Sequence, residues 1–142
     1  MAKILLKFVS KTHGFLYRLT GGRLGGKIGK AQVVLLTTTG RKSGQRRTAP
    51  LLAMPDGENM VVVASNGGSD QPPAWWLNLQ KQPEADLQVR SETKRVRAER
   101  ASEEEQARLW PRIVEMYAGY DEYQKKTERN IALVILKPAG QG

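Results

Sequence analysis

Residues 48–65 read TAPLLAMPDGENMVVVAS, two apolar runs on either side of Pro55-Asp56-Gly57-Glu58. An Asp-Gly pair between apolar runs is a strong hairpin signal, because the turn needs residues that accept positive φ. We therefore predict that residues 48–54 and 59–65 are neighbouring antiparallel strands. A preceding strand is predicted at residues 31–39, where β-branched residues accumulate before Gly40.

The rest of the chain predicts three further strands and three helices. Alternating or continuous apolar patterns predict strands at 85–90, 94–100 and 131–136. Helices are predicted at 74–79, 102–117 and 121–127. The second begins with a capping box, in which Ser102 is followed three residues later by Glu105. Six strands with helices between them predict a mainly β (α+β) fold, an antiparallel six-stranded split barrel with peripheral helices.

The 142 residues suit one folded domain, predicted at 31–142. Residues 1–30 predict a basic amphipathic helix followed by a Gly-rich joint, with apolar residues on one side and lysines at four-residue spacing on another. Lys7 and Lys11 interrupt the apolar run, which excludes a spanning helix and argues against a secretory signal. We expect a cytoplasmic protein whose first helix either packs on the barrel or makes peripheral contact with the anionic inner face of the cell membrane.

Positive charge is concentrated at one end of the chain. The net charge is +9, and residues 1–55 hold eleven Lys and Arg but no acid, whereas residues 56–142 hold twelve against fourteen acids. Such a one-signed segment attracts a polyanion: nucleic acid, anionic lipid or a phosphorylated cofactor. The chain has no cysteine and one histidine, so thiolate chemistry is excluded, a zinc site is not expected, and redox chemistry would need a cofactor.

The densest cluster of chemical groups is Gly40-Arg41-Lys42-Ser43-Gly44-Gln45-Arg46-Arg47. Guanidinium and ammonium groups bind phosphate oxygens, and glycines let backbone N–H groups approach an anion. A solvated basic turn is the alternative interpretation. The spacing of a Walker motif is absent, so a nucleoside triphosphate site is not predicted.

Several ordered motifs resemble one family, the deazaflavin-dependent nitroreductases and quinone reductases. The resemblance rests on LLTTTGRKSG (35–44), RTAPL (47–51), ASNGG (64–68), PAWWLNL (73–79) and three later tyrosines, Tyr117, Tyr120 and Tyr123. It implies an FMN-binding-protein-like split barrel that binds coenzyme F(420), an 8-hydroxy-5-deazaflavin with a phosphate and an oligoglutamate tail. Several members of this family are associated with the membrane.

The resemblance also implies roles for individual residues. On the phosphate and tail it places Arg41, Lys42, Ser43 and Arg47. Along the edges of the deazaflavin ring it places Thr48, Ala49, Pro50, Val63, Ala64, Ser65 and Asn66. The ring site is completed by Ala74, Trp75, Trp76, Leu77, Asn78 and Tyr120, although either tryptophan could instead be a plain core residue. Over the acceptor it places Tyr117, Tyr120 and Tyr123, for which amphipathic packing with partly solvated hydroxyls is the alternative. From its position in the Ala-Ser-Asn-Gly-Gly motif, we expect Ser65 to donate a hydrogen bond to a substrate oxygen that becomes negative.

The implied activity is hydride transfer from the reduced deazaflavin to a quinone, a nitro compound or another activated acceptor, without a covalent nucleophile or a metal. Leu52 stands where some members carry a tyrosine, and Asn66 where others carry a bulkier or charged residue, so the preferred acceptor does not follow. Three alternatives stay open: a flavin mononucleotide reductase on the same barrel, a cofactor-binding protein without catalysis, and a basic nucleic-acid-binding module. The last is disfavoured, because the basic region lacks aromatic residues free to stack on bases.

Overall fold

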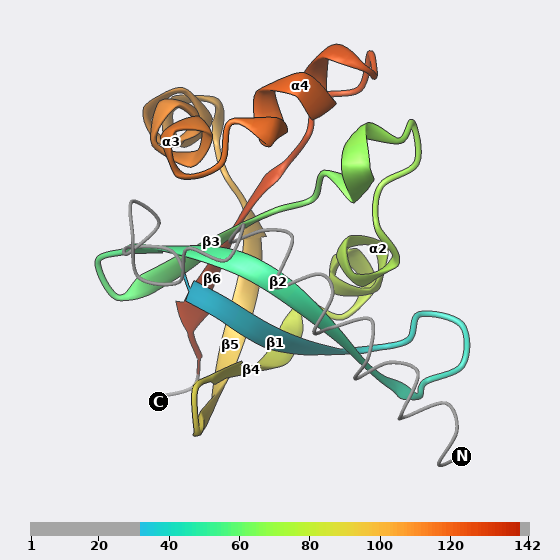
Figure 1. Ribbon diagram of the computed structural model, residues 1–142. Coiled ribbons are helices and arrows are strands. Elements are labelled where there is room, and N and C mark those ends of the chain that lie inside the picture. The colour runs from blue at the N-terminus through green and yellow to red at the C-terminus, as the bar shows by residue number, and fades with distance from the viewer. Residues whose placement is uncertain (1–31, 140–142) are drawn as a thin grey trace.

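Six strands form one closed antiparallel barrel in the computed structural model, which describes residues 32–139 (Figure 1). The strands are β1 (Gln32–Thr39), β2 (Arg46–Asp56), β3 (Asn59–Val63), β4 (Glu84–Val89), β5 (Glu92–Arg100) and β6 (Leu133–Pro138). Their order around the barrel is β1-β2-β3-β6-β5-β4, and β4 closes it by pairing with β1. The predicted six-stranded antiparallel barrel is confirmed. The N-terminal helix and joint predicted at 1–30 lie outside the described residues.

The predicted hairpin is formed by β2 and β3. Asp56 pairs with Asn59 across a turn in which Gly57 has a φ of +63°, a conformation that suits glycine. β2 begins two residues earlier than predicted, because Arg46 and Arg47 pair with Thr39 and Thr38 of β1. Arg47 therefore lies on a strand and not in the loop.

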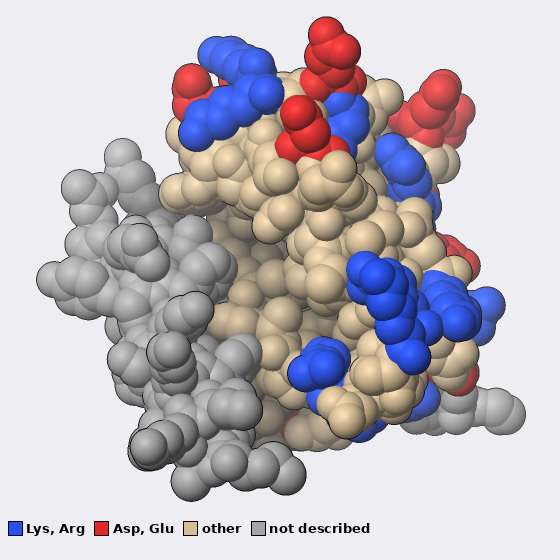
Figure 2. All heavy atoms as spheres, turned by 90° about the vertical axis from the view of Figure 1, so that its right-hand side faces the viewer, with Lys and Arg blue, Asp and Glu red and all other residues tan. Residues whose placement is uncertain are grey.

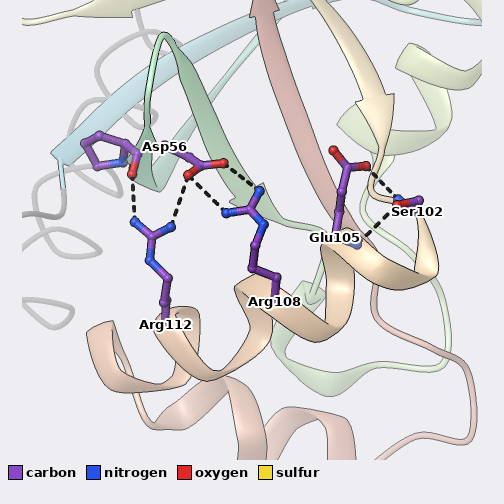
Figure 3. Close-up of polar contacts among 6 residues, drawn as sticks. Asp56, Ser102, Glu105, Arg108 and Arg112 are labelled. Atoms are coloured by element: carbon purple, nitrogen blue, oxygen red, sulfur yellow. Dashed lines mark hydrogen bonds and ion pairs between the residues drawn. The ribbon is translucent and has the colours of Figure 1, made fainter.

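The helices lie outside the barrel strands: α2 (Ala74–Lys81), α3 (Glu103–Met116), α4 (Gly119–Lys125) and the short 3-10 turn η1 (Asn66–Gly68) (Figure 1). The predicted capping box opens α3, where Ser102 Oγ accepts from the Glu105 amide at 3.1 Å and Glu105 Oε1 accepts from the Ser102 amide at 2.9 Å (Figure 3). Tyr117 caps α3 instead of belonging to it. No helix within residues 32–139 is long and apolar enough to cross a membrane.

The hydrophobic core has two parts that share β3 and β6. Val62 and Val134 pack with α2 in one cluster, while Val61 and Ile135 pack with α3 and α4 in the other. Both strands are therefore buried on both faces, which explains their continuous apolar sequences. β4 and β5 bury only alternate residues, which agrees with the alternating apolar pattern of their sequences.

The hairpin tip is tied to α3 by one carboxylate. Asp56 accepts from Arg108 at 3.1 Å and from Arg112 at 3.0 Å (Figure 3). The hydrogen bond from Arg108 is the largest cause that lowers the pKa of Asp56, with Arg112 adding to it. Because Arg108 and Arg112 are four residues apart, they lie on the same face of α3. The clamp therefore ties α3 to the turn between β2 and β3.

Candidate active site

The β1–β2 loop is a closed turn that presents its cations at one end of the barrel. The Gly40 amide donates to the Gln45 carbonyl at 2.7 Å, and the Gly44 amide donates to the Gly40 carbonyl at 2.9 Å. Gly44 has a φ of +73°, which a residue with a Cβ rarely adopts. Arg41, Lys42 and Ser43 are thus held in a short, defined turn.

Asn78 of α2 fastens this loop to the barrel. Its Oδ1 accepts from both the backbone amide and Nη1 of Arg41, each at 3.0 Å. Its Nδ2 donates to Thr38 Oγ1 at 3.1 Å. Asn78 is 4% exposed and Thr38 is fully buried, so these bonds satisfy groups that water cannot reach. Asn78 therefore acts on the loop through Arg41.

Arg46 and Arg47 are adjacent on β2 and point to opposite sides of the strand. Arg46 forms an ion pair with Asp86, which Arg95 also contacts at 3.0 Å. The hydrogen bond from Arg95, followed by the charge of Arg46, lowers the pKa of Asp86. Arg47 instead lines a cavity, and within residues 32–139 it forms no ion pair.

We call this cavity the cation cavity. It measures about 400 Å³ and is lined by Thr38, Gly40, Arg41, Lys42, Ser43, Arg47, Thr48, Ala49, Ala74, Trp75 and Asn78. Figure 2 views the side on which the β1–β2 loop and α2 lie in Figure 1. In its lower half Lys and Arg lie with few acids beside them, whereas at the top Lys and Arg lie among most of the acids in view. The cavity thus combines a cationic rim with the aromatic surface of Trp75, which suits an anion attached to an aromatic body.

A second cavity, the tyrosine cavity, measures about 220 Å³. It is lined by Pro50, Leu51, Leu52, Val63, Ser65, Gly67, Tyr117, Tyr120 and Tyr123. The Tyr117 and Tyr120 rings meet edge to face with centroids 5.0 Å apart, and the Tyr117 and Tyr123 hydroxyls are 3.3 Å apart. The predicted tyrosine cluster is therefore present, built from the cap of α3 and two residues of α4.

The phenols of Tyr117 and Tyr120 stay protonated at neutral pH. The hydrogen bond to Tyr123, together with burial, raises the pKa of Tyr117 to about 12. Burial raises the pKa of Tyr120 further still above its usual value. The tyrosine cavity can therefore offer neutral O–H donors to an acceptor oxygen.

Two glycines allow the tyrosine cavity its shape. A Cβ on Gly119 would lie 2.6 Å from the ring of Tyr117, so that ring rests directly on the glycine. A Cβ on Gly68, whose φ is +86°, would lie 2.9 Å from the carbonyl oxygen of Tyr123. A side chain at Gly68 would therefore push η1 and α4 apart.

The two cavities are joined by consecutive residues of one strand. Thr48 and Ala49 of β2 line the cation cavity, and Pro50, Leu51 and Leu52 line the tyrosine cavity. Because a strand rises about 3.3 Å per residue, a molecule lying along this edge spans both cavities within a few residues. The arrangement can hold the anionic group of a ligand in the cation cavity and aromatic rings in the tyrosine cavity.

Four of the residues implicated by sequence line neither cavity. Trp76 and Ala64 belong to the core, Leu77 is half-buried, and Asn66 is exposed and donates from Nδ2 to the Gln71 carbonyl at 2.9 Å. The other implicated residues line one cavity or the other. Their contacts with a ligand stay a prediction.

Thr38, Leu51 and Gly67 line the cavities but were missed by sequence reasoning. Thr38 could have been found from strand alternation, because Thr37, Thr38 and Thr39 alternate between faces and only Thr38 is fully buried. Gly67 lies in the motif ASNGG (64–68), but its place in the cavity depends on how η1 packs against α4.

Comparison with known proteins identifies related chains. A family profile described as F420H(2)-dependent quinone reductase matches residues 9–138. The Mycobacterium tuberculosis protein named F420H(2)-dependent quinone reductase Rv1261c is 37% identical over 130 residues, 89% of this chain and 87% of that protein. Rv3178 of the same organism, whose name assigns it provisionally to the same activity, is 44% identical over 82% of this chain and 98% of that protein. A solved structure titled F420-H2 dependent reductase (FDR-A) is 36% identical, with a TM-score of 0.69 over 75% of this chain and 94% of that one.

Proposed function

Because this chain belongs to the F420H(2)-dependent quinone reductase family, we propose that it binds reduced coenzyme F(420) along β2 and reduces a quinone in the tyrosine cavity. The observation that carries the proposal is the continuous edge of β2 between the cation cavity and the tyrosine cavity. When its anionic group is bound in the cation cavity, the rest of the cofactor is directed along β2 toward the tyrosine cavity.

The residues of the cation cavity fit such a cofactor. Lys42 and Arg47 line the cavity and form no ion pair with another described residue, whereas neighbouring Arg46 is neutralised by Asp86. Cations without acidic partners are the natural ligands of a phosphate and of carboxylates. When bound, the reduced deazaflavin supplies the hydride, and the protein supplies binding, orientation and exclusion of water.

We assign the ring contacts to backbone groups of Thr48, Ala49 and Pro50 on one side and to Val63, Ser65 and Trp75 on the other. Tyr117, Tyr120 and Tyr123 orient the acceptor. Tyr117 and Tyr120 do so as neutral donors, since the pKa of Tyr117 is raised to about 12 and burial raises that of Tyr120. Ser65 donates a hydrogen bond to the acceptor oxygen that gains negative charge. Ser65 lines the tyrosine cavity, and its hydroxyl makes no hydrogen bond to another residue in the described range. Such a donor is worth most where water is excluded.

Two titrations test the cofactor and the reaction together. The purified protein is titrated with coenzyme F(420) and, separately, with flavin mononucleotide, followed by absorbance and fluorescence. A menaquinone analogue is then added to the reduced complex. We expect tight binding of the deazaflavin only, and oxidation of the reduced cofactor by the quinone. Preferential binding of flavin mononucleotide, or stable reduced cofactor in the presence of quinone, would refute the proposal.

Ser65→Ala tests the donor role at the acceptor. We expect kcat with the quinone to fall by about tenfold to a hundredfold, because one donor to a developing oxyanion is lost. Cofactor affinity is expected to fall by less than kcat, since Ser65 is one of several ring contacts and the cation cavity is untouched. Unchanged turnover in this variant would remove Ser65 from the mechanism.

We further propose nitro compounds as a second class of acceptor and peripheral contact with anionic membranes. The first rests on the resemblance of the motifs and on the shared need for an oxygen-bearing acceptor beside donors. The second rests on the basic amphipathic pattern of residues 3–19 and on the solubility of quinones in lipid. Turnover with a nitroimidazole and sedimentation with vesicles containing anionic lipid test them separately, and an absence of either signal rejects that part alone.

A further inference from the structure

Arg129, between α4 and β6, contacts the backbone of the segment that follows β3. Its Nη2 donates to the Ser65 carbonyl at 2.9 Å, its Nε to the Ser69 carbonyl at 2.9 Å, and its Nη1 to the Ala64 carbonyl at 3.2 Å. One guanidinium therefore binds three carbonyls of residues 64–69. This segment supplies Ser65 and Gly67 to the tyrosine cavity.

The backbone around Arg129 is fixed in turn to α4. Gln124 of α4 donates from Nε2 to the Arg129 carbonyl at 2.8 Å. The Arg129 amide donates to Thr127 Oγ1 at 3.3 Å, and that hydroxyl donates to Asp70 Oδ1 at 2.8 Å. Arg129 thus bridges two walls of the tyrosine cavity: the segment with Ser65 on one side and α4, with Tyr120 and Tyr123, on the other.

We propose that Arg129 is a positioning residue for the acceptor, which sets the spacing between Ser65 and the tyrosines. That the acceptor is a quinone rests on the proposed function. The position of Arg129 between the two walls rests on the contacts described above. Gly68 packs against the Tyr123 backbone so closely that a Cβ would not fit, so the two walls have one tight spacing. Without the guanidinium, the segment 64–69 loses the bonds that hold it at that spacing.

Only arginine can make these contacts. Its planar fork offers five N–H donors in fixed directions, while a lysine ammonium is a single point of charge on a flexible stem. Within residues 32–139 no carboxylate pairs with Arg129, so backbone geometry and not a charge pair determines its position. Arg129→Lys therefore keeps the positive charge but loses the simultaneous hydrogen bonds to the three carbonyls.

The test compares Arg129→Lys and Arg129→Gln with Arg108→Gln as the matched control, since Arg108 also anchors a loop but lies in the hairpin clamp. We expect both Arg129 variants to raise the KM for a menaquinone analogue by roughly tenfold or more, because small displacements of positioning groups are costly. Coenzyme F(420) affinity should change by less than the KM, because the cation cavity that holds the anionic end of the cofactor lies outside the segment 64–69. Arg108→Gln should leave both quantities near wild type, because it removes an exposed ion pair on the far side of α3 from the segment 64–69 and Arg112 still holds Asp56.

A readout without turnover separates this inference from the proposed function. Hydrogen–deuterium exchange of the cofactor-free protein should show faster exchange of amides in residues 65–71 in the Arg129 variants and not in the control. If the Arg129 variants do not fold, Thr127→Val, which removes the contact with Asp70, must give the same changes at smaller size. The proposal is overturned if Arg129→Lys has both a wild-type KM and wild-type exchange. If the Arg129 variants do not fold, the same result in Thr127→Val overturns it. A wild-type protein that reduces no quinone refutes the proposed function, and the exchange data then decide on Arg129 alone.

Discussion

Replacing Asn78 with alanine should weaken both the fold and the grip on the cofactor. The change removes three hydrogen bonds, two to Arg41 and one to Thr38. At about 1 kcal/mol net for each bond, the free energy of unfolding should fall by roughly 3 kcal/mol. Most of this cost comes from groups that stay buried without a partner.

The same change frees the start of the β1–β2 loop. If Arg41 and Lys42 must be ordered again on binding, at about 1 kcal/mol each, the affinity for coenzyme F(420) should fall by roughly 30-fold. Asn78→Asp separates the two effects. Its carboxylate still accepts from Arg41 and from a rotated Thr38 hydroxyl, so stability should stay closer to wild type. Its negative charge in the cation cavity should still weaken cofactor binding.

Thermal unfolding and fluorescence titration measure both effects. Gln80→Ala, on the exposed side of the same helix, is the control and should change neither quantity by much. Wild-type affinity in Asn78→Ala would refute the reasoning that Asn78 organises the loop. Equal losses of stability in the alanine and aspartate variants would show that the hydrogen bonds are not the source of the cost.

Three other predictions concern α3 and the tyrosine cavity. Gly119→Ala should displace the Tyr117 ring, because a Cβ would lie 2.6 Å from it. The KM for a quinone should then rise roughly tenfold with unchanged cofactor affinity. An unchanged KM in steady-state assays argues against the ring contact. Asp56→Asn should lower the melting temperature at neutral pH. This difference from wild type should shrink as the pH falls below 3.8, the ordinary pKa of an aspartate, because the lowered pKa of Asp56 stabilises the fold only while the carboxyl is ionised. A difference that does not depend on pH contradicts this. Stability should decline as the pH rises from 10 toward 12, because the raised pKa of Tyr117 favours the protonated fold, and Tyr117→Phe should show a weaker decline in alkaline unfolding; an equally steep decline assigns the effect to other groups.

The local elements could be predicted because their signals are local. Asp56-Gly57 predicted the β2–β3 turn, and Ser102 with Glu105 predicted the start of α3, since both depend on residues within four positions. The final strand was predicted to begin at residue 131, but it begins at Leu133. Gln124 Oε1 accepts from the Ile131 amide and Gln106 Nε2 donates to its carbonyl, so side chains from two helices take the place of a neighbouring strand.

The site was predicted in composition but not in detail. Clustering of Arg41, Lys42, Ser43 and Arg47 followed from their closeness in the chain. The sequence did not predict that Arg46 is paired while Arg47 lines the cavity. That difference depends on Asp86, which is forty residues away from Arg46 in the chain but lies beside β2. Arg129 carries no motif, and its role appears only when the segment after β3 folds against α4.

The central claim is that the cation cavity binds the anionic end of the cofactor, and a binding measurement on two variants tests it most directly. In Lys42→Gln/Arg47→Gln the Asn78 network stays intact, and two charge-assisted contacts at about 1.5 kcal/mol each are lost. We predict that the dissociation constant for coenzyme F(420) rises roughly a hundredfold and depends less on salt. Arg46→Gln, which removes the neighbouring arginine already paired with Asp86, should change it by less than about threefold. Wild-type affinity in the double variant, or an equal loss in Arg46→Gln, would contradict the account.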